Sequence, residues 1–242
     1  MNLRVDLHLH TTASDGRWPP ERLVAEVRQA GIGLFAVTDH DSLDSLAPTL
    51  CLVRGSGLRL LPGVELSSQW EGQWYHLLAY GVDGQDADFR AFVAANQARL
   101  RQVGDDAIAL LVQAGWPIPL DEYETYTWDR RRGGWKALNF LLDYGFCADL
   151  PGYFALFHEV GFPPTHFATP PEVIAAVRRA GGVVILAHPG AYFTNGLDRA
   201  RLDRLIEAGV QGLECYSSHH DAARTGELVD YCRRRDLLIT GG

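Results

Sequence analysis

The chain has 242 residues, 47% of them hydrophobic, so it is long enough for one large domain or for a domain with an insertion. The formal net charge of −8 argues against duplex nucleic acid as a partner, because a duplex binder needs a basic face. Apolar runs are too short to span a bilayer, no signal-peptide pattern opens the chain and the four cysteines form no Cys-x-x-Cys pair, so we expect a cytoplasmic protein with reduced thiols and no membrane partner.

The first predicted element is a strand over residues 5–10, in which apolar residues alternate with Asp6, His8 and His10. Residues two apart on a strand point to the same side, so the two imidazoles can converge on one point at the end of the strand. Two converging imidazoles suit a borderline metal ion. The alternative is an exposed strand with two incidental histidines.

The next part of the chain alternates between helices and strands. Helices are predicted over residues 19–30 and 42–54, and strands over residues 33–38, 58–65 and 74–82. His40 directly follows the first of these strands, Glu65 ends the second and His76 lies within the third. Each strand therefore brings one candidate metal ligand.

Residues 85–167 contain no convincing strand pattern. One long helix, or two in tandem, is predicted from Asp86 to about Gly115, and shorter helices are predicted over residues 135–144 and 153–159. We interpret residues 85–167 as a helical insertion that caps the site, and residues 1–84 and 168–242 as the domain that it interrupts.

Alternation then resumes, with helices over residues 171–180, 198–208 and 222–235, and strands over residues 183–187, 211–216 and 237–240. Seven strands in βα alternation predict a parallel sheet, either closed as a barrel or open and doubly wound. Polar residues, including His188 after the fifth strand, gather at the carboxyl ends of the strands. A barrel brings all such ends to one face, which favours a seven-stranded barrel.

The candidate metal ligands are too numerous for one ion. They are His8, His10, Asp15, His40, Glu65, His76 and His188. Since a carboxylate can bridge, two or three divalent ions are expected, and the donor set suits Mn, Zn or Fe. The alternatives are an exposed strand-end acid at Glu65, a hydrogen-bonded core histidine at His76 and a simple turn residue at His188.

The ordered set of motifs resembles the polymerase and histidinol phosphatase (PHP) phosphoesterases. The matching segments are Asp6-x-His8-x-His10, Ser14-Asp15-Gly16, Thr38-Asp39-His40-Asp41, Gly63-Val64-Glu65, His76, Ala187-His188-Pro189-Gly190, Gly212-Leu213-Glu214 and His220. The resemblance implies an α/β fold, a distorted seven-stranded (β/α)7 TIM-like barrel with an inserted helical subdomain, and a trinuclear metal centre. It points to the nucleotide phosphatase branch of that family.

The resemblance also implies individual roles. His8 and His10 would hold the first ion, and Glu65 would bridge it to the second. His76 and His188 would complete the second ion, while Asp15 and His40 would hold the third. Asp6, Asp39 and Asp41 would orient imidazoles. His220, chosen over its neighbour His219, would face the substrate phosphate.

Two features depart from the family pattern. The family places a Ser-Asp-x-His segment after its last strand, where this chain has Ile239-Thr240-Gly241-Gly242, so we expect the sequence to be cut short. Within the insertion, a Gly-Arg-Pro-His-like helix start is replaced by a basic segment from which Arg131, Arg132 and Lys136 are expected to bind an anion. The alternative for these cations is a solvated surface patch.

The expected function is hydrolysis of a small phosphomonoester, a nucleotide such as AMP or a 3′,5′-bisphosphate, by a metal-bridging hydroxide. Glu65 and His220 are the expected catalytic residues, with His220 also contacting substrate. The alternatives are a histidinol-phosphate phosphatase, a nuclease-like diesterase or, without the terminal motif, a non-catalytic module that binds metal or phosphate. The sequence does not indicate an oligomeric state.

Overall fold

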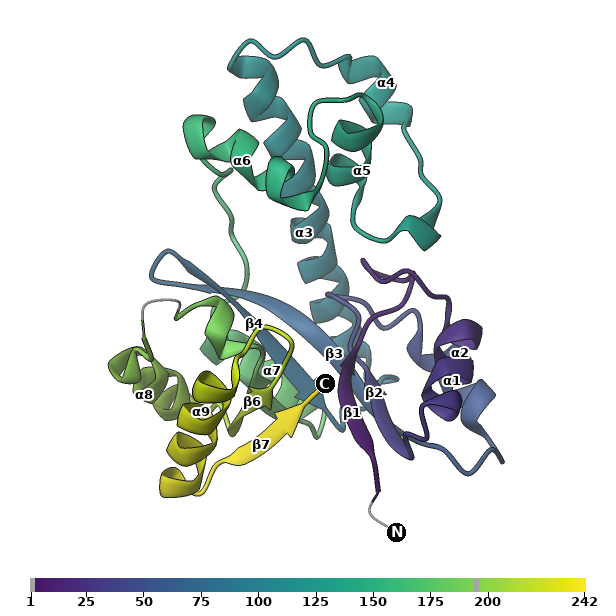
Figure 1. The fold of residues 1–242 in the computed structure, drawn as a ribbon, viewed down its shortest axis with the longest axis vertical. Coiled ribbons are helices and arrows are strands. Elements are labelled where there is room, and N and C mark those ends of the chain that lie inside the picture. Colours follow the sequence, from purple (N-terminus) through teal and green to yellow (C-terminus); the bar gives the residue numbers. More distant parts are fainter. Residues whose placement is uncertain (1–2, 194–195) are drawn as a thin grey trace.

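A computed structural model describes residues 3–193 and 196–242, and the strands within these ranges form one seven-stranded sheet in chain order. The strands are β1 (Val5–Leu9), β2 (Leu34–Val37), β3 (Arg59–Trp70), β4 (Gln73–Tyr80), β5 (Val183–Leu186), β6 (Gly212–Tyr216) and β7 (Leu238–Gly241). The sheet curls until β7 lies beside β1 (Figure 1). The expected distorted TIM-like barrel is confirmed, and it is nearly closed.

The fully parallel sheet expected from the alternation is wrong at β4, which pairs antiparallel with both β3 and β5. No helix separates β3 from β4 in the described chain, because Glu71 and Gly72 turn it directly back with φ of 51° and 76°. Such a two-residue turn suits a hairpin. As a result β3 continues five residues beyond Glu65, and Glu65 lies within the strand rather than at its end.

Five helices accompany the barrel strands: α1 (Pro20–Gln29), α2 (Leu46–Val53), α7 (Pro170–Arg179), α8 (Arg199–Ala208) and α9 (Ala222–Arg235), counted over the described residues. Their buried faces follow helical spacing, as in Leu23, Val24 and Val27 of α1, which pack beside Phe35 of β2. No helix within the described ranges has the length and apolarity needed to cross a lipid bilayer.

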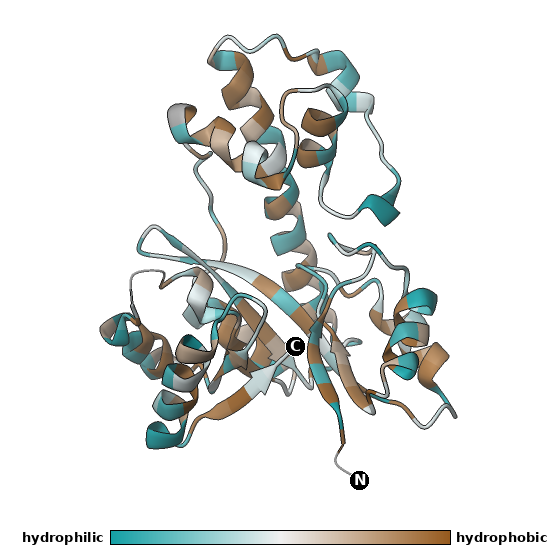
Figure 2. Cartoon of the chain, viewed as in Figure 1, coloured by the Kyte–Doolittle hydropathy of each residue, from teal (hydrophilic) through white to brown (hydrophobic). Residues whose placement is uncertain are grey.

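Residues 87–160 form a helical segment with a hydrophobic core of its own. Its helices are α3 (Ala87–Gln113), α4 (Leu120–Thr125), α5 (Lys136–Asp143) and α6 (Leu150–Val160), with a short 3₁₀ turn over Arg130–Arg132. The core contains Ile108, Leu111, Phe140, Leu141 and Phe157. The apolar positions of α5 and α6 are brown in Figure 2. Of the two alternatives predicted after Asp86, one long helix or two in tandem, the structure has the single helix α3. Helix α4 was not predicted.

Besides the chain that returns from α6 to α7, two connections in the described residues join the helical segment to the barrel. The first is α3 itself, which runs from the barrel into the segment (Figure 1). Phe89 and Val93 of α3 belong to the barrel core. The second is the Gly133–Gly134 turn, where the Gly134 N–H donates to the Asp15 carbonyl oxygen at 2.8 Å. Gly133 has a φ of 75°, and a Cβ there would lie 2.7 Å from the same oxygen, so glycine permits the close approach.

Candidate metal site

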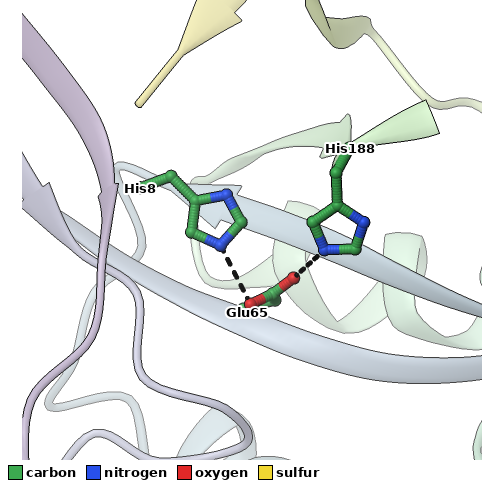
Figure 3. A group of neighbouring side chains, drawn as sticks. All are labelled: His8, Glu65 and His188. Atoms are coloured by element: carbon green, nitrogen blue, oxygen red, sulfur yellow. Dashed lines mark hydrogen bonds and ion pairs between the residues drawn. The ribbon is translucent and has the colours of Figure 1, made fainter. Parts of the chain in front are cut away.

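The candidate site is built around the fully buried carboxylate of Glu65, which five imidazoles surround. Glu65 Oε2 lies 3.0 Å from His8 Nε2, 3.2 Å from His10 Nε2 and 3.4 Å from His40 Nδ1. Glu65 Oε1 lies 3.0 Å from His188 Nε2 and 3.3 Å from His76 Nδ1. Figure 3 shows His8 and His188 meeting opposite oxygens of this carboxylate. The histidines therefore divide into two groups, one for each oxygen.

The five imidazoles reach Glu65 from four parts of the barrel. His8 and His10 alternate along the end of β1, and their ring centroids are 5.0 Å apart. His40 follows β2, and its backbone forms a parallel bridge with Glu65. His76 lies on β4, the antiparallel strand, and therefore reaches the site from mid-strand. His188 follows β5 with a φ of 27°, a sparsely populated conformation of the kind that clusters at functional sites.

Asp15 extends the cluster on the side of His10 and His40. Its Oδ1 is 3.1 Å from His10 Nδ1, and its Oδ2 is 3.8 Å from His40 Nε2. The structure thus brings together all seven residues that the sequence singled out as ligands. Their individual roles in holding ions remain proposals.

The protonation of the imidazoles follows from burial and from the carboxylates beside them. Burial alone lowers the pKa of His8, but Glu65 and Glu214 outweigh this effect and raise it to about 9. Burial also opposes charge on His10, and Asp15 and Glu65 outweigh it, so its pKa rises well above the usual value. For His40, burial wins and lowers the pKa to about 3. The carboxylates around His8 and His10 therefore favour positive charge at this end of the barrel.

The donor set fits divalent metal ions. Within the described ranges, His40 Nδ1 and His76 Nδ1 are buried and have no hydrogen-bond partner, although both lie within 3.4 Å of a Glu65 oxygen. A buried nitrogen without a partner is costly in a protein interior. A metal ion shared between imidazole nitrogen and carboxylate oxygen would satisfy both groups.

Glu214 belongs to the site but received no role from the sequence. It lies on β6 with 1% exposure, its Oε1 is 2.9 Å from His8 Nδ1, and its Oε2 accepts a hydrogen bond from the His188 N–H at 2.6 Å. A carboxylate behind a ligating histidine fixes the direction and tautomer of the ring. The signal was a lone acid in an apolar strand, Gly212-Leu213-Glu214.

Asp6, Asp39 and Asp41, expected to orient imidazoles, have backbone amides and neutral side chains as their hydrogen-bond partners in the described residues. Asp39 accepts hydrogen bonds from the Thr11 N–H and the hydroxyls of Thr11, Ser14 and Ser45. Asp6 accepts one from the His8 N–H at 3.3 Å. Asp41 accepts from Ser67 and Asn96. These acids fix the loops that carry the ligands.

His220, the expected contact of the substrate phosphate, lies in the loop after β6. Its Nε2 accepts a hydrogen bond from the Gly190 N–H at 2.9 Å, and its Nδ1 lies 3.0 Å from the Cys215 carbonyl oxygen. Both ring nitrogens of His220 therefore have hydrogen-bond partners in the backbone. The neighbouring His219 is exposed, and its ring centroid lies 5.1 Å from that of His188. Of the two rings, that of His219 is the one found beside a candidate ligand in the described residues.

The three cations expected to bind substrate all have partners within the helical segment. Arg131 pairs with Asp129, and Arg132 makes two hydrogen bonds to Asp143, at 2.8 and 2.7 Å. Lys136, the first residue of α5, lies 4.2 Å from the centre of the Tyr123 ring. The turn between Arg132 and Lys136 is the one that contacts the Asp15 loop. Their contact with substrate remains a proposal.

A nearly closed α/β barrel with imidazoles and carboxylates converging at one end is typical of metal-dependent hydrolases. The comparisons with known proteins specify it further: residues 6–138 match the PHP domain, and the chain belongs to the PHP family of phosphoesterases. The family resemblance noted in the sequence is therefore confirmed.

Relatives within this family have different activities. The 5′-3′ exoribonuclease Rnm of Escherichia coli is 31% identical over 206 residues, which cover 83% of this chain and 69% of the relative. A 3′,5′-nucleoside bisphosphate phosphatase of Chromobacterium violaceum is 27% identical over 252 residues, covering 98% of this chain and 85% of the relative.

Two solved structures share the fold. One, from Bifidobacterium adolescentis and described as a metal-dependent phosphoesterase, is 28% identical with a TM-score of 0.81 and covers 100% of this chain and 87% of the other. Another, from Chromobacterium violaceum and described as an amidohydrolase with bound sulfate, is 24% identical with a TM-score of 0.83, covering 99% and 86%. The second supports the fold alone.

Proposed function

We propose that the protein hydrolyses a small phosphomonoester, and that this substrate is a nucleotide such as AMP or a nucleoside 3′,5′-bisphosphate. The observation that carries the proposal is the convergence of five imidazoles on Glu65 at one end of the barrel. The 3′,5′-nucleoside bisphosphate phosphatase, whose similarity extends over 98% of this chain, supports a nucleotide substrate.

The ligand assignment follows the two oxygens of Glu65. His8 and His10 would hold a first ion on the Oε2 side, and His76 and His188 a second on the Oε1 side, with Glu65 shared by both. Asp15 and His40 would hold a third ion. When bound, the ions supply a water molecule of lowered pKa and positive charge opposite the phosphate oxygens. Glu65 is essential in this scheme because it joins two of the ion sites.

A histidine of the loop after β6 would protonate the leaving alkoxide. The sequence assigned this role to His220, and the geometry offers His219 as well, because its ring lies beside His188. Separate alanine variants of the two residues distinguish them. The one whose loss slows an alkyl phosphate more than an activated aryl phosphate is the proton donor, since a good leaving group needs no proton.

Residues 85–167 would form the cap that recognises the leaving group. The hydrogen bond from the Gly134 N–H to the Asp15 carbonyl oxygen supports this role, because it holds the turn between Arg132 and Lys136 against a loop that carries a candidate ligand. A substrate whose phosphate occupies the metal site would extend its nucleoside toward this turn.

A second candidate is a 5′-3′ exoribonuclease, supported by the 31% identity to Rnm. The net charge of −8 argues against a duplex but is compatible with a single-stranded end that enters the site, because bound ions reverse the local field.

The test is phosphate or nucleotide release by Mn²⁺-loaded protein from AMP, a nucleoside 3′,5′-bisphosphate, histidinol phosphate and a 5′-phosphorylated oligoribonucleotide. A higher kcat/KM for a mononucleotide supports the proposal, and a higher value for the oligonucleotide supports the exoribonuclease. Preference for histidinol phosphate, or activity that survives chelation, would contradict both.

A further inference from the structure

Asn96 is a fully buried polar side chain on α3, between the two hydrophobic cores that this helix joins. Its Nδ2 donates hydrogen bonds to Asp41 Oδ1 at 2.6 Å and to the Ser67 carbonyl oxygen at 2.7 Å. The other buried residues of α3 in the described chain are apolar. At Asn96, therefore, α3 is attached to the barrel by hydrogen bonds, in addition to the apolar packing of its other buried residues.

Both acceptors lie on segments that carry candidate metal ligands. Asp41 directly follows His40, and its N–H donates to the Glu65 carbonyl oxygen at 2.8 Å. Ser67 lies two residues beyond Glu65 on β3 and pairs with His76 of β4. The amide of Asn96 thus contacts residues next to or paired with three candidate ligands, His40, Glu65 and His76.

Asp41 needs this support because of its backbone conformation. It has a φ of 46°, which a residue other than glycine adopts rarely and keeps only where its surroundings determine it. Its carboxylate accepts from the Ser67 N–H at 3.0 Å, the Ser67 hydroxyl at 2.6 Å and Asn96. Without the amide, Asp41 Oδ1 keeps a single donor, and the Ser67 carbonyl oxygen loses this donor altogether.

We propose that Asn96 is a positioning residue of the metal centre, fastening α3 to the backbone that directs His40, Glu65 and His76. The inference rests on the proposed metal site. Because Asn96 touches no reacting atom, its loss should weaken metal binding and lower kcat while leaving KM for a small aryl phosphate little changed. A residue needed only for folding would affect stability without that pattern.

The test is Asn96→Leu, which keeps the branched shape and the four side-chain heavy atoms but removes the amide. Mn²⁺ affinity is measured by calorimetry on metal-stripped protein, and kcat and KM with p-nitrophenyl phosphate. Loss of a direct hydrogen-bond partner of a metal ligand typically costs about 10–100-fold in affinity or activity. Asn96 acts through Asp41 and Ser67, so a decrease at the lower end, about 10-fold, is expected in both Mn²⁺ affinity and kcat. If this variant does not fold by circular dichroism, Asn96→Ser is measured by the same criteria.

Thr165→Val is the matched control. Thr165 is 8% exposed, and its hydroxyl accepts from Trp74 Nε1 at 2.7 Å and donates to Gln69 Oε1 at 2.9 Å, so it also joins β3 and β4, but toward the hairpin tip. Its loss should leave Mn²⁺ affinity and kcat unchanged.

Wild-type Mn²⁺ affinity and kcat in folded Asn96→Leu, or equal losses in the control, would overturn the inference and leave the proposed function intact. A wild-type protein that binds no metal would overturn both.

Discussion

His8 Nδ1 lies 2.9 Å from Glu214 Oε1, while the opposite nitrogen of the same ring lies 3.0 Å from Glu65 Oε2. The imidazole is therefore held between two buried carboxylates, one in the centre of the candidate metal site and one behind it. The other oxygen of Glu214 accepts the His188 N–H at 2.6 Å. One side chain of β6 thus sets the position of histidines from both β1 and the end of β5.

Glu214→Gln should weaken metal binding and activity about 10–100-fold, the usual effect of losing a carboxylate behind a ligating histidine. A glutamine has a single acceptor oxygen, so it cannot serve both His8 and the His188 N–H. The measurement is Mn²⁺ affinity by calorimetry together with kcat. Glu207→Gln, on α8, is the control, and equal behaviour of the two variants would contradict the role of Glu214.

Glu65→Ala should abolish phosphoester hydrolysis and reduce bound metal by more than one equivalent, because the carboxylate is shared between two ion sites. Elemental analysis of protein purified without chelator measures the loss. Glu71→Ala changes an exposed acid on the same hairpin and should retain full metal content and turnover. Wild-type turnover in Glu65→Ala would exclude the bridging role.

Metal addition should stabilise the protein against heat. An ion that binds the folded chain at 100 times its Kd contributes about 2.7 kcal/mol, which a thermal scan resolves readily. We expect the Tm of metal-stripped protein to rise with Mn²⁺ concentration, and Glu65→Ala to abolish the rise. A Tm that does not respond to Mn²⁺, Zn²⁺ or Fe²⁺ in the wild type would contradict the metal site.

Alanine variants of Arg131, Arg132 and Lys136 test the cap. At least one should lower kcat/KM for the natural nucleotide and spare a generic aryl phosphate, because the small substrate does not reach the helical segment. The quantity to compare is the ratio of the two kcat/KM values in each variant. An unchanged ratio in all three would mean that these cations serve only the ion pairs and ring contact seen in the structure.

Phe140→Ala should destabilise the core of the helical segment by about 3–5 kcal/mol, since the ring is fully buried and stacks with Tyr144 at 4.2 Å. Hydrogen exchange should increase across α5 and α6 and remain slow in β5. The exposed Phe154 supplies the control, and its alanine variant should change little. Equal loss of protection in β5 would show that the segment is not an independent unit.

Most of the fold could be predicted because two signals of an amphipathic helix are visible in the sequence: the spacing of its apolar residues and the residues at which it begins and ends. The helix predicted over residues 222–235 coincides with α9, and the one over residues 171–180 differs from α7 by one residue at each end. The direction of β4 could not be predicted from βα alternation, which assumes a helix between strands. Glu71-Gly72 between two apolar segments was the available signal, as two-residue hairpin turns favour glycine.

The candidate ligands could be predicted because histidines and acids at strand ends are visible in the sequence. Their hydrogen-bond partners could not, since these depend on contacts between distant elements. Glu214 reaches His8 across the barrel, and Asn96 reaches Asp41 from α3. The choice between His219 and His220 likewise depended on the backbone of residues 217–220, which sets which ring turns inward.

The hairpin of β3 and β4 has a consequence for how the chain folds. Parallel strands can pair only after a long crossover connection has folded back, whereas the two strands of a hairpin are joined by a short loop. An isolated hairpin forms within about 1–10 μs. Glu65 and His76 are therefore brought together by local pairing, at small cost in chain entropy. His8 and His188 are 180 residues apart in the sequence and can meet only when the barrel assembles. Because local contacts form faster than contacts between distant residues, the β3–β4 hairpin is favoured as a folding nucleus. This hairpin already contains the Glu65 carboxylate, on which the remaining imidazoles converge.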